Sequence, residues 1–243
     1  MIPLAIPALV VAALVAGVLR TTLGVGAGIF LTATMSLLFE PRRVLGAMAV
    51  IQIAFDVSAG YHFRGQWHRR LLRPLIPSTV AGVLVGTWLV ATAPGPWLRT
   101  VMGVGLIAYT ALQFVRERQP RGESRGAGLG AAVAIGILSG AASALVNVSG
   151  VILALYLQRI RLPQGIFLGT LTATQFVQDI IKLVAYRQVG LLGVEEVSLS
   201  IPFIPLIFVG GVIGMRLNRY ISPVLFGRLL LVFVLLSGVR LLW

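Results

Sequence analysis

Six apolar segments of about 20 residues each constrain this sequence more than any other feature. They lie near residues 44–63, 74–92, 97–115, 163–186, 198–217 and 223–242. A helix of about 20 residues is about 30 Å long, which matches the hydrocarbon thickness of a bilayer. Within lipid every backbone polar group must find a partner inside the protein, so apolar runs of this length cross as helices. We therefore predict an all-α, polytopic protein of a bacterial plasma (inner) membrane.

The composition excludes several classes of function. Charged residues form 11% of the chain, less than half of the ~25% found in soluble domains. The chain has no Cys and two His, which excludes thiolate sites and Cys nucleophiles and leaves little metal chemistry. The net charge of +13 comes from Arg residues between the spans, as expected for cytoplasmic loops and not for nucleic-acid binding. We expect no cofactor, no metal site and no enzymatic activity.

An internal repeat divides the chain into two halves. At an offset of 123 residues, four polar or Gly positions coincide: Gly46, Gln52, Asp56 and Arg64 align with Gly169, Gln175, Asp179 and Arg187. Further along, the offset drifts to 128 and 129, as loop insertions would produce. We predict a first transmembrane repeat at 1–115, a polar cytoplasmic linker at 116–126 and a second transmembrane repeat at 127–243.

Each half opens with a Gly-punctuated apolar segment, at 3–39 and 127–158. These segments are too short for two ordinary crossings and long for one. A re-entrant hairpin of two short helices fits best, followed by three transmembrane helices in each half. Irregular backbone at membrane depth must be buried or line a watery cavity, so the breaks are candidate site residues. The alternative is that the glycines serve only close helix packing.

The distribution of basic residues favours inverted repeats. If each hairpin returns to its own side, every half has three crossings and the second half is upside down. On that topology one side carries 13 Arg and the other carries 6 basic residues. Single crossings of the opening segments would give almost no bias, so the positive-inside rule favours inversion with both termini outside.

The sequence resembles the sulfite exporter TauE/SafE family. The resemblance rests on the two-fold repeat and on three short motifs, at 24–30 (GVGAGIF), 146–151 (VNVSGV) and 168–173 (LGTLTA). It covers nearly the whole chain and implies a permease or exporter for small sulfur-containing or organic anions, such as sulfite or sulfonates. We expect access to alternate around a midplane site. An anion channel, or a proton- or cation-coupled importer of a small anion, are the alternatives.

Candidate substrate-binding residues lie where the two Gly-rich segments converge. Guanidinium, hydroxyl and amide groups, together with free backbone N–H groups at the starts of short helices, favour compact oxyanions. The candidates are Arg20, Thr21, Thr22, Gly24, Gly26, Gly28, Gln52, Asn147, Ser149, Gly150 and Gln175. For Arg20 the alternative is a side chain that extends to the membrane interface.

Charged residues inside the spans are the candidates for coupling. Gln52 and Asp56 are four residues apart, as their repeat equivalents are, so each Gln–Asp pair lies on one helix face. Lys182 follows Asp179 by three residues and can neutralise it, either for transport or as a simple intrahelical ion pair. The position equivalent to Lys182 is Ala59, so we expect Asp56 to bind a proton or cation, with a bridge to Arg20 as the alternative. The expected partners are a small anion, the lipid bilayer and protons.

Overall fold

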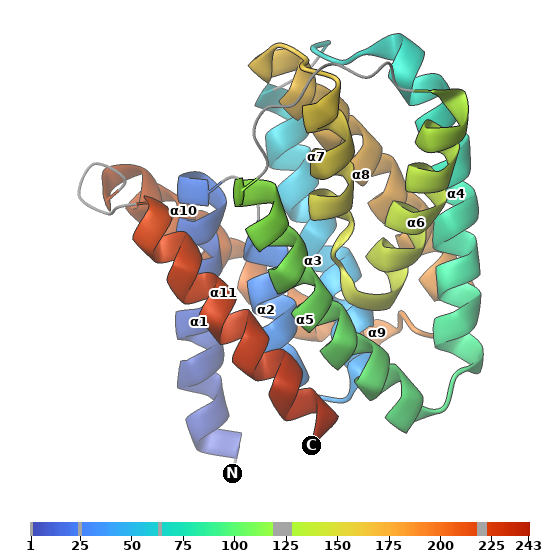
Figure 1. Ribbon diagram of the computed structural model, residues 1–243. Coiled ribbons are helices and arrows are strands. Elements are labelled where there is room, and N and C mark those ends of the chain that lie inside the picture. Colours follow the sequence, from blue (N-terminus) through green and yellow to red (C-terminus); the bar gives the residue numbers. More distant parts are fainter. Residues whose placement is uncertain (1, 24–25, 63–64, 119–127, 218–222) are drawn as a thin grey trace.

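The computed structural model describes residues 2–23, 26–62, 65–118, 128–217 and 223–243, and all its regular structure there is helical (Figure 1). The first half contains α1 (Ile2–Leu23), α2 (Ala27–Ser36), α3 (Pro41–His62), α4 (Arg69–Thr92) and α5 (Gly95–Arg118). The second half contains α6 (Leu129–Val146), α7 (Ser149–Arg159), α8 (Gln164–Gln188), α9 (Val194–Ser200), α10 (Phe203–Leu217) and α11 (Pro223–Leu242).

The predicted helices appear with one difference. The segment expected as one helix at 198–217 is divided into α9 and α10. Pro202 lies between them, and a proline lacks the backbone donor that would continue the helix. Among the described residues, three stretches are long and apolar enough to cross a membrane: Arg69–Thr92, Leu129–Val146 and Val194–Gly214. The chain is thus an all-helical protein with several membrane-spanning candidates.

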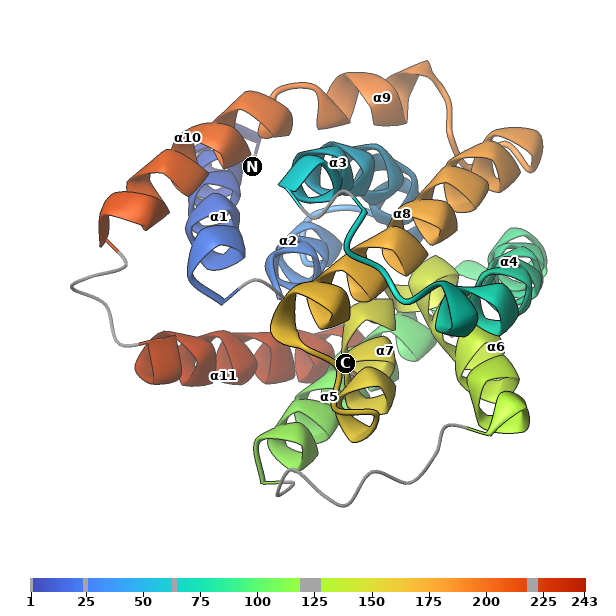
Figure 2. The ribbon, with the colours of Figure 1, turned by 90° about the horizontal axis from the view of Figure 1, so that it is seen from above.

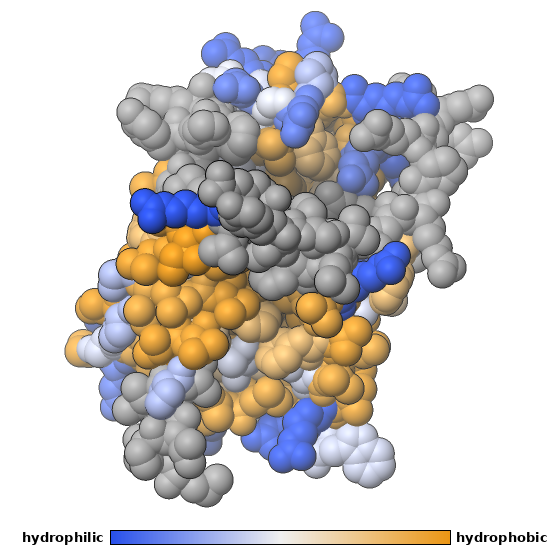
Figure 3. Space-filling view, turned by 90° about the vertical axis from the view of Figure 1, so that its left-hand side faces the viewer, coloured by the Kyte–Doolittle hydropathy of each residue, from blue (hydrophilic) through white to orange (hydrophobic). Residues whose placement is uncertain are grey.

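The surface has the polarity that a bilayer requires. On the face drawn in Figure 3, apolar residues form a band between hydrophilic residues at the two ends of the molecule. Several large apolar side chains are more than half exposed to solvent in the isolated chain: Trp88, Leu129, Leu138, Phe208, Leu229 and Leu236. Exposed apolar area on this scale is stable when the surrounding medium is lipid.

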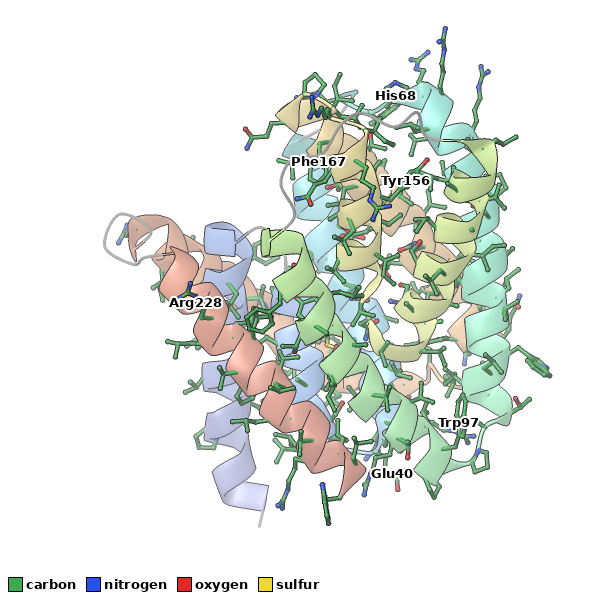
Figure 4. All side chains as sticks on the ribbon, viewed as in Figure 1. Glu40, His68, Trp97, Tyr156, Phe167 and Arg228 are labelled. Carbon is green, nitrogen blue, oxygen red and sulfur yellow. The ribbon has the colours of Figure 1, made fainter. Side chains whose placement is uncertain are left out.

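The opening segments of both halves are helical hairpins. The N-terminal end of α1 and Glu40, which follows α2, lie at the lower end of the molecule (Figures 1 and 4). The first residues of α6 and the last of α7 lie at the upper end, where His68 and Phe167 also lie. In the second hairpin the chain reverses its direction at Asn147, whose φ is 57°. In the first hairpin Gly26, with φ 100°, is the residue directly before α2. Each hairpin therefore begins and finishes at one end of the molecule, and the two hairpins use opposite ends.

Helices of the two halves pack against each other in matching pairs. In Figure 2, α1 lies beside α10 and α4 beside α6, and contacts also join α3 with α8 and α5 with α11. Glycines permit the closest approaches. A methyl group at Gly17 would lie 2.1 Å from the carbonyl oxygen of Ile207, and one at Gly140 would lie 2.2 Å from that of Thr79. Gly17 and Gly140 are 123 residues apart and Thr79 and Ile207 are 128 apart, so the two contacts match the sequence repeat.

We predict that Gly17→Ala and Gly140→Ala both lower the thermal unfolding midpoint in detergent. The added methyl group meets a backbone carbonyl that cannot rotate away, and overpacking of this kind costs roughly 1–3 kcal/mol. The matched control is Gly130→Ala on α6, where nothing lies within 4 Å of the new methyl group. This control should be neutral or slightly stabilising, because Ala favours helix over Gly by about 1 kcal/mol. Equal midpoints for Gly140→Ala and Gly130→Ala would show that the close contact does not constrain packing.

Candidate functional site

The two helical hairpins meet around a small polar cavity of about 60 Å³ inside the protein. Residues at the beginnings of α2 and α7 form one part of its wall, and side chains from α3, α5 and α8 form the rest. The lining residues are Gly26, Gly28, Ile29, Gln52, Phe55, Asp56, Tyr109, Gln113, Asn147, Val148, Gly150, Val151, Gln175 and Asp179.

The N-termini of α2 and α7 both border this cavity. The first backbone N–H groups of a helix have no acceptor within it, and the helix dipole makes this end positive. Neither Gly26 before α2 nor Val148 before α7 provides a side-chain cap. Two uncapped, electropositive helix ends therefore converge on one small space, which is the arrangement that binds anions.

Two Gln–Gly pairs flank the cavity in equivalent ways. A methyl group at Gly28 would lie 3.2 Å from Nε2 of Gln52, and one at Gly150 would lie 3.0 Å from Nε2 of Gln175. The glycines thus let each amide approach the first turn of a short helix. An amide nitrogen is a hydrogen-bond donor, so both halves bring a neutral donor to the same place.

Lys182 lies at the centre of a hydrogen-bond network behind the cavity. Its side chain is fully buried, and its Nζ is 2.6 Å from Oδ1 of Asp179. Nζ also donates to Oε1 of Gln52 at 2.5 Å, to Oδ1 of Asn147 at 3.0 Å and to Oγ of Ser143 at 3.5 Å. Asn147 in turn donates from Nδ2 to Oγ1 of Thr32 at 3.2 Å. The ammonium group therefore connects α3 of the first half with α6 and α8 of the second.

The cavity has two acidic side chains in its wall. Asp56 and Asp179 each have 4% of their surface exposed. With Lys182 beside Asp179, the described side chains at the site comprise two carboxylates and one ammonium. Among the described residues, no group of three or more His, Cys, Asp or Glu side chains could hold a metal ion.

Most of the predicted site residues border the cavity. Its wall includes Gly26, Gly28, Gln52, Asn147, Gly150 and Gln175 from the predicted substrate set, and Asp56 and Asp179 from the coupling set. Ser149 is buried but does not belong to the wall, where its neighbours Val148 and Gly150 lie. The side chains of Arg20, Thr21 and Thr22, and Gly24 as a whole, lie outside the described residues. Their roles in binding or coupling stay predictions.

Several residues of the site were not predicted from the sequence. Tyr109 and Gln113 border the cavity from α5, where Nε2 of Gln113 donates to the Tyr109 hydroxyl at 3.1 Å. Their four-residue spacing inside an apolar span was the available signal. Ser143 precedes Asn147 by four residues in the same way, so both lie on the face of α6 that contacts Lys182. Thr32 gave no such signal, because its partner is 115 residues away.

The helical fold, the apolar band and the buried polar cavity define a polytopic membrane protein whose cavity is the candidate site. The family model for the sulfite exporter TauE/SafE matches residues 9–241. The chain belongs to this family and is a membrane transporter. Searches of curated proteins and of solved structures gave no match.

We predict that Lys182→Met strongly destabilises the protein, because Asp179 would keep an uncompensated charge in the interior. Removing one partner of a buried ion pair costs about 3–5 kcal/mol. The double variant Lys182→Met/Asp179→Asn should recover most of this loss in the apparent free energy of unfolding. Arg43→Met is the control, since Arg43 pairs with Glu195 at an exposed position, where an ion pair contributes at most about 1 kcal/mol. If Lys182→Met is no worse than Arg43→Met, the network does not hold the helices together.

Proposed function

We propose that the chain is a permease that carries one compact oxyanion of the sulfite or small sulfonate class through the central cavity. The observation that carries this proposal is the convergence of two uncapped helix N-termini and two Gln amides on one cavity. Backbone N–H groups, amide N–H groups and positive helix ends are donors that suit the oxygens of a small anion.

The size of the cavity favours a compact substrate. Pockets for drug-sized ligands have volumes of roughly 300–1,000 Å³, whereas this cavity has about 60 Å³. Such a space admits an ion of a few heavy atoms without its hydration shell. A bulky organic anion would need the helices to separate.

The charges at the site favour a proton bound together with the anion. Asp56 and Asp179 both border the cavity, each with 4% of its surface exposed, and Lys182 forms an ion pair with Asp179. An anion beside two carboxylates would be repelled, so we propose that Asp56 takes up a proton when the anion binds. A dianion with one proton still has net charge −1, and a negative cytoplasm favours its exit by about 2.3 kcal/mol per 100 mV.

The proposed mechanism is alternating access between two inverted repeats. Support comes from the hairpins, which turn back at opposite ends of the molecule, and from the matching contacts of α1 with α10 and of α4 with α6. In the bilayer these hairpins would be re-entrant, each with its break at the cavity. The basic end that carries Arg69, Arg70 and Arg73 would be cytoplasmic, with both termini on the opposite side.

We predict that Gly28→Ala and Gly150→Ala each weaken anion binding by at least tenfold. Each methyl group displaces a Gln amide, at 3.2 and 3.0 Å respectively. Binding is measured from the rise in thermal unfolding midpoint with sulfite concentration, with benzenesulfonate as the bulky comparison. Gly130→Ala should bind as the wild type does. If benzenesulfonate raises the unfolding midpoints of the wild type and of the variants as much as sulfite does, the cavity does not select its ligand by size.

We also predict that Asp56→Asn removes the pH dependence of transport. In proteoliposomes, wild-type sulfite flux should fall as the pH rises, by at most about tenfold per pH unit for one required proton. The Asn variant, which mimics the protonated carboxyl, should give a nearly flat profile. Glu40→Gln is the control, because Glu40 is exposed at the end of the molecule. If the wild-type flux does not depend on pH, or if the flux of Asp56→Asn depends on pH as that of the wild type does, Asp56 does not couple transport to a proton.

A further inference from the structure

A stripe of polar side chains follows one face of α8 from the upper end of the molecule to Lys182. Thr170, Thr174, Gln178 and Lys182 are spaced by four residues and therefore lie along one face. All four have 0% of their surface exposed. The stripe begins beside the loop before α4, where the backbone N–H of His68 donates to Oγ1 of Thr170 at 2.9 Å.

Polar side chains of α4 and α6 also lie along the stripe. Nε2 of Gln178 donates to Oγ of Ser139 at 3.1 Å, and Lys182 reaches Ser143 and Asn147 one and two turns further along α6. Thr79 is fully buried on α4, which packs against both α6 and α8. Figure 2 shows these three helices side by side. A polar side chain thus recurs at every turn of α8 from the level of His68 to Lys182, beside the cavity.

Helix packing alone does not explain these groups. Hydroxyl groups in membrane helices usually donate to the carbonyl one turn back, as Thr174 does to Thr170 at 2.8 Å. The amide of Gln178 instead donates to Oγ of Ser139 on α6, away from its own helix. Its Oε1 atom and the Oγ1 atom of Thr79 are buried, and neither has a hydrogen-bond partner among the described residues. Buried polar atoms of this kind normally bind ordered water.

The sequence repeat gives an internal comparison. Counted back by 123 residues, the positions of Thr170, Thr174 and Gln178 correspond to Ala47, Ile51 and Phe55 on α3. Ser139 corresponds to Ala16, and Thr79 corresponds at the offset of 128 to Ile207. These apolar equivalents are buried in the matching group formed by α1, α3 and α10. Apolar residues therefore fill the equivalent positions in the matching group. The polar stripe occurs in only one of the two groups, on one side of the cavity.

We infer that α4, α6 and α8 enclose a narrow hydrated route that carries protons between the His68 end of the molecule and the cavity. The route ends at Lys182 and at the carboxylates of Asp179 and Asp56, which accept a proton from the last water. The other titratable groups nearby are Tyr186 on α8, which donates to the carbonyl of Ala144, Tyr109 on α5, and Tyr156 on α7. The hydroxyl of Tyr156 is buried without a hydrogen-bond partner among the described residues, in one apolar cluster with Leu75, Ala132 and Leu171. The described residues of α4 and α6 contribute hydroxyl and amide groups to this face and no titratable side chain. The inference deepens the proposed proton coupling and rests on it.

The first test measures water access without requiring transport. The chain has no Cys, so single variants Thr174→Cys, Gln178→Cys and the repeat-matched control Ile51→Cys each provide one thiol. Vesicles of known orientation are treated with Ag⁺, a small cation that binds thiols, then washed, denatured and labelled with a maleimide. We expect Ag⁺ applied at the His68 side to block labelling at positions 174 and 178 and to leave position 51 labelled. Equal blocking at positions 174 and 51, or no blocking at 174 and 178, would overturn the hydrated route.

The second test measures proton flux in proteoliposomes with an entrapped pH indicator and a sulfite gradient. Thr174→Val and Gln178→Leu should slow proton movement at least tenfold, with sulfite binding unchanged in the thermal assay. Ile51→Val is the matched packing control, and Gln178→Glu, which keeps a polar chain, should restore most of the flux. Unchanged proton flux in Gln178→Leu would overturn the inference. Absence of sulfite binding in the wild type would instead contradict the proposed function and leave the Ag⁺ result as a separate test of the route.

Discussion

The interaction on which the rest of the structure depends is the set of hydrogen bonds around the buried ammonium group of Lys182. A charge inside the membrane is costly unless it is paired and fully hydrogen-bonded. Asp179, Gln52 and Asn147 meet this requirement from α8, α3 and α6. Because Gln52 comes from the first half and the other two from the second, the same bonds that stabilise the charge also hold the two halves in register around the cavity.

Glycine makes this convergence sterically feasible. At Gly17, Gly82, Gly140 and Gly210 a backbone carbonyl of the neighbouring helix lies where a side chain would begin. In lipid, close packing of this kind replaces the hydrophobic effect as the force between helices. The paired halves therefore share one packing scheme, while the chemistry of the side chains inside it is free to differ. Lys182 and Ala59 are equivalent positions of the sequence repeat, so the two halves differ in charge at this position.

Much of the fold and part of the site could be predicted from the sequence. Apolar length identified the helices because lipid leaves few alternatives, but it could not detect the break between α9 and α10, since Pro202 interrupts a run that is apolar throughout. The repeat identified Gln52, Asp56 and their equivalents as neighbours on a helix face. It could not show that Lys182 reaches Gln52, because that bond joins residues 130 positions apart whose proximity depends on the packing of α3 against α8.

The asymmetry of the two halves gives the clearest link between packing and transport. A carrier with two identical halves would offer the same path to ions and protons on both sides of its site. At the matched positions the group of α1, α3 and α10 carries Ala, Ile and Phe, while the group of α4, α6 and α8 carries Thr, Ser and Gln. Water and protons are stable only where such polar groups can bind them. On the proposed function and the route inferred above, the anion would use a cavity lined by residues of both halves. The proton would reach this cavity from one side, so that the fold would separate the two movements in space.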